Sequence, residues 1–212
     1  MFILHRMRTH LPNGFQYLPE YFDRAAQVDL LAAVTAVARG DAPFFQGRMP
    51  RTGQPISVVG TNFGPLGWVA DIKGYRYDPV HPKTGEPWPT MPQSLLDIWD
   101  DLTNYPAPPE ACLINWYREG NKMGMHVDRD EHDLGAPIVS ISLGDPARYR
   151  LGGQKRGGKT HSLKLSSGDV VVLADEARRC YHGVDKIFYG QSTLVPKGGR
   201  VNLTLRRVNR VK

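Results

Sequence analysis

The residues best suited to chemistry in this sequence are a histidine and an aspartate two positions apart, His126 and Asp128. If this segment is extended, both side chains project from the same face, because side chains alternate along a strand. One imidazole and one carboxylate can then take neighbouring positions on a metal ion. A second imidazole must come from elsewhere, and His182, which follows a strongly apolar run, is the best candidate. Such a set would leave three positions of an octahedral ion open to other ligands.

Two histidines and one carboxylate on one face of an ion are typical of non-haem Fe(II) oxygenases. Taken alone, a His-x-Asp pair is a weak indication. A purely structural role, with His126 hydrogen-bonded in a core and Asp128 capping a turn, explains the pair as well. The metal hypothesis therefore needs support from other parts of the chain.

The segment from 200 to 206 offers that support, because its even positions are polar and its odd positions are apolar. On a strand, Arg200, Asn202 and Arg206 would share one face, with the apolar residues packed behind them. Arginines six residues apart lie about 20 Å apart on an ideal strand, so both reach one small dianion only by curling inward. A dicarboxylate fits two guanidinium groups. A solvent-facing strand of an antiparallel sheet explains the alternation too.

Asn115 and Tyr117 repeat the two-residue spacing and add uncharged hydrogen-bond donors. Four motifs now follow one another along the chain: Asn-x-Tyr at 115–117, His-x-Asp at 126–128, a distal His at 182 and Arg-x-Asn-x-x-x-Arg at 200–206. In this order they resemble the AlkB family of Fe(II)- and 2-oxoglutarate-dependent dioxygenases. The resemblance is clear from about residue 60 to 207 and weaker in the first forty residues. The block 136–144 and the Gly152-Gly153 pair strengthen it.

The resemblance implies an α+β, mainly β fold, a double-stranded β-helix or jelly roll with N-terminal helices and a nucleotide-recognition lid. It implies that His126, Asp128 and His182 bind Fe(II), with 2-oxoglutarate and O2 as co-substrates. The reaction would be oxidative demethylation of 1-methyladenine and 3-methylcytosine in single-stranded DNA, a repair reaction that releases formaldehyde. In such chemistry the protein positions the methyl carbon and excludes side reactions, while the cofactor breaks the bond.

The same resemblance assigns the residues that would hold 2-oxoglutarate. Arg200, Tyr117 and Asn202 would bind its distal carboxylate, and Arg206 with Asn115 would serve the end that chelates iron.

The resemblance also implies a pocket for a base that has left its stack, since an enzyme cannot reach a base inside a duplex. Trp68 would stack on the flipped base, and Tyr75 and Tyr77 would line the pocket or touch the phosphate backbone. Asp130 would meet the exocyclic amine and favour the positive charge of the methylated base. Arg156 would complete the base contacts. Packing within a surface lid explains each of these residues as well.

Two other motifs lack an element or residues that their chemistry requires. Residues 153–160 match the phosphate-loop pattern, but that loop must be followed by a helix, whereas 161–165 alternate like a strand. We therefore interpret the segment as a basic hairpin loop. The acidic run 128–133 resembles a calcium loop, but Asp133 stands where that loop needs glycine and Val139 where it needs glutamate.

The length of 212 residues predicts a single domain, 1–212, with a helix and the lid in 1–90 and the jelly-roll core in 91–212. Apolar residues at helical spacing predict helices over 23–39 and 93–102, and the Gly-, Pro- and aromatic-rich stretch 41–90 predicts loops and short strands. Short β-rich runs follow at 112–116, 137–143, 170–173 and 201–207.

Lys and Arg number 27 against 21 Asp and Glu, and this net charge of +6 suits an anionic partner such as nucleic acid without requiring one. Cys112 and Cys180 are the only cysteines, which excludes a disulfide framework and favours a reducing compartment. No apolar run approaches the 18 or so residues that span a bilayer. The first ten residues lose their apolar character at His5, so we expect no signal peptide. We also expect no membrane contact, a cytoplasmic location and a monomer.

Two alternatives stay open at this point. The same iron chemistry could act on RNA, because nothing in the sequence senses a 2′-hydroxyl group. A jelly-roll module that binds without turnover is a different class of protein, for which an intact metal triad and two arginines would be unnecessary.

Overall fold

The computed structural model describes residues 11–211, so the expectation about a signal peptide falls on residues outside this range. The described chain is mainly β, as predicted. Its helices are α2 (Arg24–Arg39), α3 (Gln93–Thr103) and the 3-10 turn η1 (Ala177–Arg179). The strands are β1 (Phe15–Leu18), β2 (Val59–Phe63), β3 (Gly67–Asp71), β4 (Gly74–Asp78), β5 (Ala111–Tyr117), β6 (Met123–His126), β7 (Ile138–Gly144), β8 (Ala147–Leu151), β9 (His161–Leu165), β10 (Val170–Leu173), β11 (His182–Ile187) and β12 (Arg200–Arg206).

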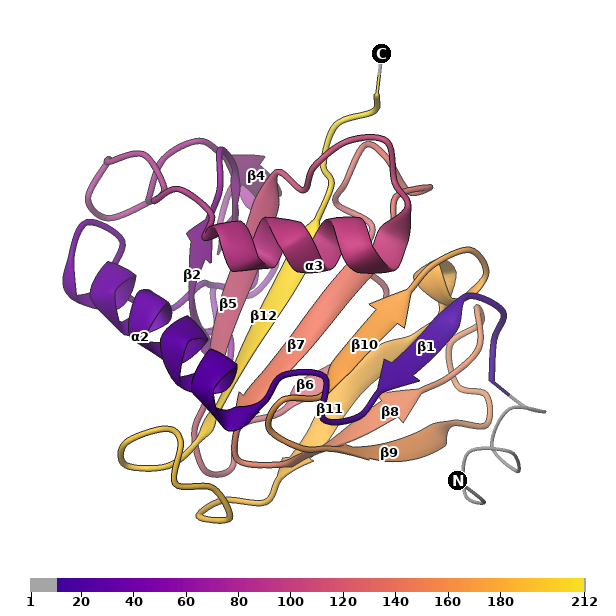
Figure 1. Ribbon diagram of the computed structural model, residues 1–212. Coiled ribbons are helices and arrows are strands. Elements are labelled where there is room, and N and C mark those ends of the chain that lie inside the picture. Colours follow the sequence, from indigo (N-terminus) through magenta and orange to yellow (C-terminus); the bar gives the residue numbers. More distant parts are fainter. Residues whose placement is uncertain (1–10, 212) are drawn as a thin grey trace.

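Two antiparallel sheets form the body of the protein (Figure 1). The larger sheet has the strand order β1-β10-β7-β12-β5-β2, and the smaller one the order β6-β11-β8-β9. Their inner faces share one apolar cluster, in which Ile138 and Leu173 of the larger sheet pack with Leu163 and Val184 of the smaller. Burying one face of each sheet against the other is the arrangement of a sandwich. The predicted double-stranded β-helix is confirmed.

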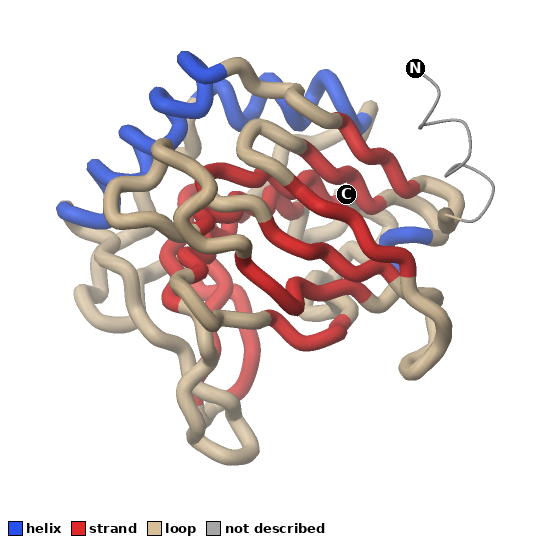
Figure 2. The backbone as a smooth tube through the Cα atoms, turned by 90° about the horizontal axis from the view of Figure 1, so that it is seen from below, coloured by secondary structure: helices blue, strands red, loops and turns tan. Residues whose placement is uncertain are grey.

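Helices α2 and α3 lie against the outer face of the larger sheet (Figures 1 and 2). The α2 helix begins after Asp23, whose side chain accepts a hydrogen bond from the Ala26 amide, as a helix N-cap does. Leu30 of α2 and Trp99 of α3 are buried against the sheet. Both helices match their predicted positions within a residue or two. They leave the opposite, inner face of the sheet available for polar side chains.

The β12 strand shows how this division works. Val201, Leu203 and Leu205 pack beneath the helices, whereas Arg200 and Arg206 on alternate positions line the space between the sheets. The predicted shared face of the polar residues is thus confirmed. The alternative of a solvent-facing strand is wrong, because every residue of β12 is buried.

The segment 41–90 forms loops and short strands, as predicted. The β3 and β4 strands make a separate hairpin, with Trp68 paired to Tyr77. Val69 of this hairpin is buried in a small apolar cluster with Ala42, Phe45 and Trp88. The larger sheet also takes in strands from this first part of the chain, because β1 and β2 are its two edges. The larger sheet therefore includes strands from both sides of residue 91.

The basic loop 153–160 joins β8 to β9, two paired antiparallel strands. Because a strand and not a helix follows this loop, the phosphate-loop motif lacks its structural context, as the sequence predicts. Neither helix in residues 11–211 has the length and apolar character that crossing a bilayer requires.

Candidate active site

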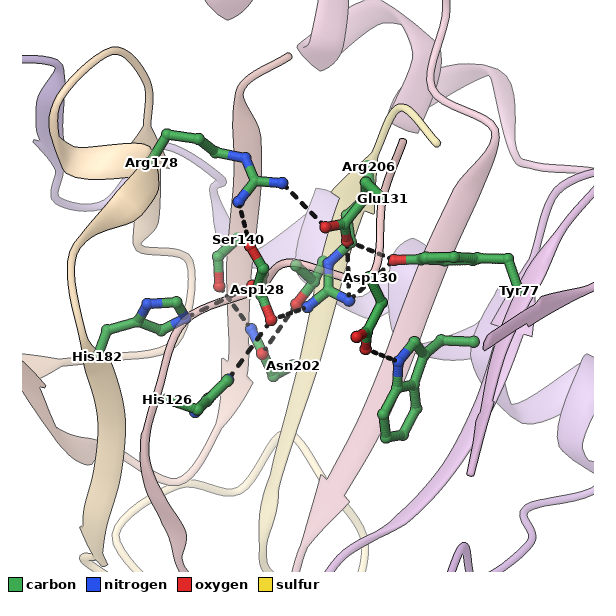
Figure 3. Close-up of polar contacts among 12 residues, drawn as sticks. Tyr77, His126, Asp128, Asp130, Glu131, Ser140, Arg178, His182, Asn202 and Arg206 are labelled. Carbon is green, nitrogen blue, oxygen red and sulfur yellow. Dashed lines mark hydrogen bonds and ion pairs between the residues drawn. The ribbon is translucent and has the colours of Figure 1, made fainter. Parts of the chain in front are cut away.

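The two histidines and the aspartate of the predicted triad come together at one end of the smaller sheet (Figure 3). His126 is the last residue of β6 and His182 the first of β11, and the two are register partners. Asp128 follows in the loop after β6. Gly183 permits this close pairing, since a Cβ atom there would lie 2.6 Å from the carbonyl oxygen of Met123. Residues 56 positions apart thereby present their imidazoles to the same carboxylate.

The orientation of both imidazoles suits metal binding. Nδ1 of His126 lies 2.8 Å from the Gly124 carbonyl oxygen, and Nδ1 of His182 lies 3.1 Å from that of Cys180. Each Nδ1–H donates to its carbonyl, which leaves the Nε2 lone pair free to bind an ion. Both Nε2 atoms lie 3.5 Å from a carboxylate oxygen of Asp128.

These three side chains fit a divalent metal ion. One ligand atom of each lies within 4.8 Å of the others. Neighbouring ligands at about 2.1 Å from an ion lie about 3 Å apart, so small side-chain movements close the set around it. The His126 side chain is 38% exposed and the Asp128 side chain 9%, so the ligand set is open to the cavity on the His126 side.

Arg206 sets the charge of the aspartate. Its Nη2 lies 2.9 Å from Oδ1 of Asp128. Burial raises the pKa of the Asp128 carboxyl, but the Arg206 charge outweighs it and holds that pKa well below its usual range. Asp128 is therefore an anion, the form that binds a metal ion.

A cavity of about 450 Å³ extends from this triad between the two sheets. All five residues predicted to hold a dicarboxylate line it: Asn115, Tyr117, Arg200, Asn202 and Arg206. Register explains their grouping, because Arg200 of β12 lies opposite Tyr117 of β5 and Asn202 lies opposite Asn115. Asn202 is further fixed by donating from Nδ2 to the Ser140 hydroxyl at 2.9 Å and to the Ile141 carbonyl at 2.8 Å.

Arg200 is a buried cation without an acidic partner among the described residues. It is 1% exposed, and of its guanidinium nitrogens Nη2 donates to the Ser142 hydroxyl at 3.0 Å, whereas Nε and Nη1 have no partner within residues 11–211. Its Cζ lies 5.3 Å from the Tyr117 ring centroid. An unpaired buried charge is costly, and a bound carboxylate would compensate it.

A profile of the 2OG-Fe(II) oxygenase superfamily matches residues 14–206. The chain belongs to this superfamily. It is 52% identical to the alpha-ketoglutarate-dependent dioxygenase AlkB homolog of Caulobacter vibrioides (strain NA1000 / CB15N) over 194 residues, 92% of this chain and 87% of that protein. It is 42% identical to the alpha-ketoglutarate-dependent dioxygenase AlkB of Escherichia coli (strain K12) over 204 residues, 94% of this chain and 93% of that protein.

The solved structure of OsALKBH1 superposes on this oxygenase with a TM-score of 0.83 at 26% identity, covering 93% of this chain and 98% of that one. The resemblance to the AlkB family is thus confirmed across nearly the whole chain. The protein is an Fe(II)- and 2-oxoglutarate-dependent dioxygenase, with O2 as the other co-substrate.

On the side of the β3–β4 hairpin, Trp68 and Tyr75 line the cavity. Their rings stack at 5.5 Å between centroids with planes 15° apart. The Trp68 Nε1 donates to Oδ2 of Asp130 at 2.8 Å. Asp130 also lines the cavity, so this hydrogen bond fixes the indole beside the triad. Arg156 lies at the rim, with its Cζ 5.6 Å from the Tyr181 ring centroid.

Tyr77 lies elsewhere than its neighbour Tyr75 and is not among the described residues that line the cavity. Its hydroxyl donates to Oε1 of Glu131 at 2.5 Å and accepts from Nη1 of Arg206 at 3.1 Å (Figure 3). Burial and the Glu131 charge raise the Tyr77 pKa against the effect of Arg206, so the hydroxyl keeps its proton. Tyr77 thus connects the hairpin to the side chains around the triad.

Sequence reasoning missed two charged residues of this oxygenase, Glu131 and Arg178. They form a buried ion pair, with Nη2 of Arg178 3.0 Å from Oε2 of Glu131 and side-chain exposures of 2% and 1%. Glu131 stands beside Asp130 in a run of acidic residues, which gives no sign that it is buried. Arg178 is followed by Arg179 near the end of a turn, and nothing in that pair indicates which arginine faces inward.

Proposed function

We propose that this oxygenase repairs DNA by oxidative demethylation of N-alkylated bases, 1-methyladenine and 3-methylcytosine, in single-stranded DNA. The observation that supports this most is the triad at the end of a cavity with a buried, unpaired Arg200 inside and Trp68 at its mouth. The names of relatives add nucleic-acid methyl groups as the substrate class: a DNA N(6)-methyladenine demethylase of Arabidopsis thaliana and a tRNA demethylase of Schizosaccharomyces pombe.

In this proposal His126, Asp128 and His182 hold Fe(II) through Nε2 atoms and the carboxylate. When bound, the iron with 2-oxoglutarate and O2 supplies the oxidant for an N-methyl carbon, and the oxidised methyl group leaves as formaldehyde. Arg200, whose unpartnered guanidinium nitrogens face no acidic side chain of the described chain, binds the distal carboxylate of 2-oxoglutarate. A carboxylate accepts two such N–H groups at once.

The other co-substrate contacts follow from position. Tyr117 and Asn202 stand beside Arg200 on facing strands, so we assign them to the same carboxylate. Arg206 lies next to the metal-binding carboxylate and serves the end of 2-oxoglutarate nearest the ion. Asn115, register partner of Asn202, completes this wall of the cavity as a neutral donor.

The base enters on the side of the hairpin. Trp68 offers a face on which a base can stack, and a stack of this kind offsets part of the cost of leaving the helix. Asp130, held by the Trp68 indole, accepts from the exocyclic amine and favours a cationic methylated base over a neutral one. Tyr75 and Arg156 at the rim complete the contacts. Tyr77 serves indirectly, through its hydrogen bonds to Glu131 and Arg206.

Three further assignments belong to this proposal. The β3–β4 hairpin and its adjoining loops form the nucleotide-recognition lid of a single oxygenase domain. The enzyme acts as a monomer, because one chain supplies all three metal ligands and the cavity. It works in the cytoplasm, where Cys112 and Cys180, both buried and unpaired, stay reduced.

The decisive experiment measures formaldehyde release from an oligonucleotide with one 1-methyladenine. We expect one formaldehyde per repaired base in the presence of Fe(II), O2 and 2-oxoglutarate, and none when 2-oxoglutarate is omitted. The unmethylated oligonucleotide is the matched control. Absence of formaldehyde while succinate still forms would reject the substrate and keep the oxygenase.

RNA is the second candidate substrate, favoured by the relative named as a tRNA demethylase. Methylated DNA and RNA oligonucleotides of the same sequence decide between them, because they differ only at the 2′-hydroxyl of RNA and the C5 methyl group of thymine in DNA. A binding module without turnover is tested by anaerobic titration of Fe(II) and 2-oxoglutarate. Charge-transfer absorbance in the visible region is expected for the oxygenase and not for such a module.

A further inference from the structure

The wall of the cavity opposite Arg200 contains a tyrosine that sequence reasoning passed over. Tyr149 lies in the middle of β8, between its register partners Leu163 of β9 and Val184 of β11. It lines the cavity together with Arg200 and Tyr117, although it comes from the other sheet. Its ring lies 6.0 Å from that of His182, with planes 27° apart. Tyr149 therefore reaches from the smaller sheet into the space where the co-substrate is proposed to bind.

The Tyr149 hydroxyl is a buried polar group without a partner. The residue is 6% exposed, and its oxygen finds no hydrogen bond within residues 11–211. Leaving a buried hydroxyl unpaired costs free energy, so native proteins rarely do so away from functional sites. Phenylalanine would fill the same apolar surroundings without that cost. The unpaired group therefore indicates a ligand.

The surroundings of this hydroxyl identify the ligand's charge. A tyrosine hydroxyl carries its proton at neutral pH, so it can donate to a ligand that accepts. The nearby Arg200 also has nitrogens without a partner, and it too lines the cavity. A donor hydroxyl and a guanidinium group that both lack acceptors complement one anionic group.

We propose that Tyr149 donates a hydrogen bond to the distal carboxylate of 2-oxoglutarate, as a further co-substrate-binding residue that joins the two sheets through the bound molecule. The inference rests on the co-substrate site proposed above. In that site Arg200 and Tyr117 hold the carboxylate from the larger sheet, and Tyr149 holds it from the smaller. The bound co-substrate then contacts side chains of both sheets.

The test uses Tyr149→Phe, which removes only the hydroxyl, in the Fe(II)-loaded enzyme without oxygen. Binding of 2-oxoglutarate is followed by charge-transfer absorbance, which requires no turnover. We expect its Kd to rise roughly tenfold, as for a lost hydrogen bond to a charged group. The Kd of 2-oxopentanoate, which has the same carbon chain and lacks the distal carboxylate, should change less than about twofold.

Thermal unfolding of the metal-free protein is the second measurement. Removing an unpaired buried hydroxyl should raise Tm by about 2–4 °C, whereas 2-oxoglutarate should stabilise the loaded variant less than the parent. The matched control is Tyr105→Phe, whose hydroxyl donates to Asp133 and is outside the cavity, and for which the Kd should not change.

Three results would overturn the inference: an unchanged Kd for 2-oxoglutarate, an equal rise for both oxo-acids, or a lower Tm of the metal-free variant. Failure of the proposed co-substrate site itself looks different. In that case the parent protein, with Tyr149 intact, binds 2-oxoglutarate no better than 2-oxopentanoate.

Discussion

Arg178 donates a hydrogen bond from Nη1 to the backbone carbonyl oxygen of Asp128 at 2.6 Å, across fifty positions of sequence. The same guanidinium group donates from Nε to the Ala136 carbonyl at 2.9 Å and pairs with Glu131. Arg178 lies in η1, the turn that leads into β11 and His182. Arg178 therefore holds the loop that carries Asp128 against the turn that precedes His182, and so fixes the separation between these two triad residues.

Arg178→Ala should weaken both folding and metal binding. It leaves the buried Glu131 carboxylate with only the Tyr77 hydroxyl and the more distant Arg206, at 3.5 Å, as partners. Loss of one partner of a buried ion pair costs about 3–5 kcal/mol. Loss of a group that orients metal ligands lowers metal affinity by about 10–100-fold. Chemical denaturation and anaerobic Fe(II) titration measure the two effects. Arg207→Ala, which breaks a more exposed pair with Glu110, serves as the control and should leave the Fe(II) affinity unchanged. Full Fe(II) affinity in a folded Arg178→Ala protein would contradict this positioning role.

Asp128→Asn should abolish turnover of 2-oxoglutarate. The variant keeps the shape of the side chain but loses the anion that binds the metal and that faces Arg206 at 2.9 Å. Succinate formation, measured with saturating Fe(II), should fall to the level without enzyme. Asp133→Asn removes a nearby carboxylate that accepts from Tyr105 instead, and it should retain activity. Succinate formation by Asp128→Asn at the parental rate would remove Asp128 from the triad.

The strands show which features of the fold could be predicted from the sequence and which could not. On β12, the alternation of polar and apolar residues was correct, because a period of two leaves few choices. The β8 strand was not predicted, because its five residues include two arginines, Arg148 and Arg150, and lack the continuous apolar run of the strands that were predicted. Whether the polar face of β12 is buried or meets solvent could not be derived either, because that depends on the second sheet.

Contacts between distant loops were the hardest to predict. Trp68 and Asp130 were both assigned to the pocket, yet their hydrogen bond joins residues 62 positions apart. Tyr75 and Tyr77 were treated alike, although a two-residue step on a short hairpin leaves one at the cavity and takes the other to Glu131. No local pattern encodes such differences, since they depend on what packs against the hairpin.

Trp68→Ala should weaken binding of a methylated oligonucleotide by about 1–3 kcal/mol, the usual contribution of one base stack. Trp68→Phe separates two roles of the indole, because it keeps an aromatic face but loses the hydrogen bond to Asp130. We expect Phe to restore most of the affinity. Fluorescence anisotropy with catalytically inactive protein measures both. Equal affinities of the alanine variant and the parent would place Trp68 outside the base pocket.

His81 should make the protein less stable in acid. The residue is fully buried, and its Nδ1 accepts from the Lys83 and Thr84 amides at 3.2 Å, which requires a neutral ring. Burial lowers the His81 pKa, opposed by the hydrogen bond to Pro43. Because an unfolded histidine takes up a proton near about pH 6.5, the unfolded state binds more protons below that pH. The stability that neutral His81 contributes is complete above about pH 6.5 and is lost as pH falls below it.

Urea unfolding between pH 7.5 and 5 measures this effect. His81→Asn is the matched variant, since its side-chain oxygen can accept the same two amide hydrogen bonds but does not titrate. We expect the parent's free energy of unfolding to fall more steeply with acid than the variant's. Parallel pH profiles would show that His81 is not the responsible group.

Arg200→Met should make the protein more stable while it destroys co-substrate binding. In the protein without ligands, Arg200 is fully buried with two unpaired nitrogens, and burial lowers its pKa despite the nearby Tyr117. Removing such a group recovers on the order of 1–3 kcal/mol, less the hydrogen bond to Ser142. Arg206→Met should instead make the protein less stable, because Arg206 is paired with Asp128. Denaturation of both variants therefore separates a cation that stabilises the protein without ligands from one that does not, and 2-oxoglutarate titration measures what each contributes to binding. A destabilised Arg200→Met protein that still binds 2-oxoglutarate would reverse this assignment.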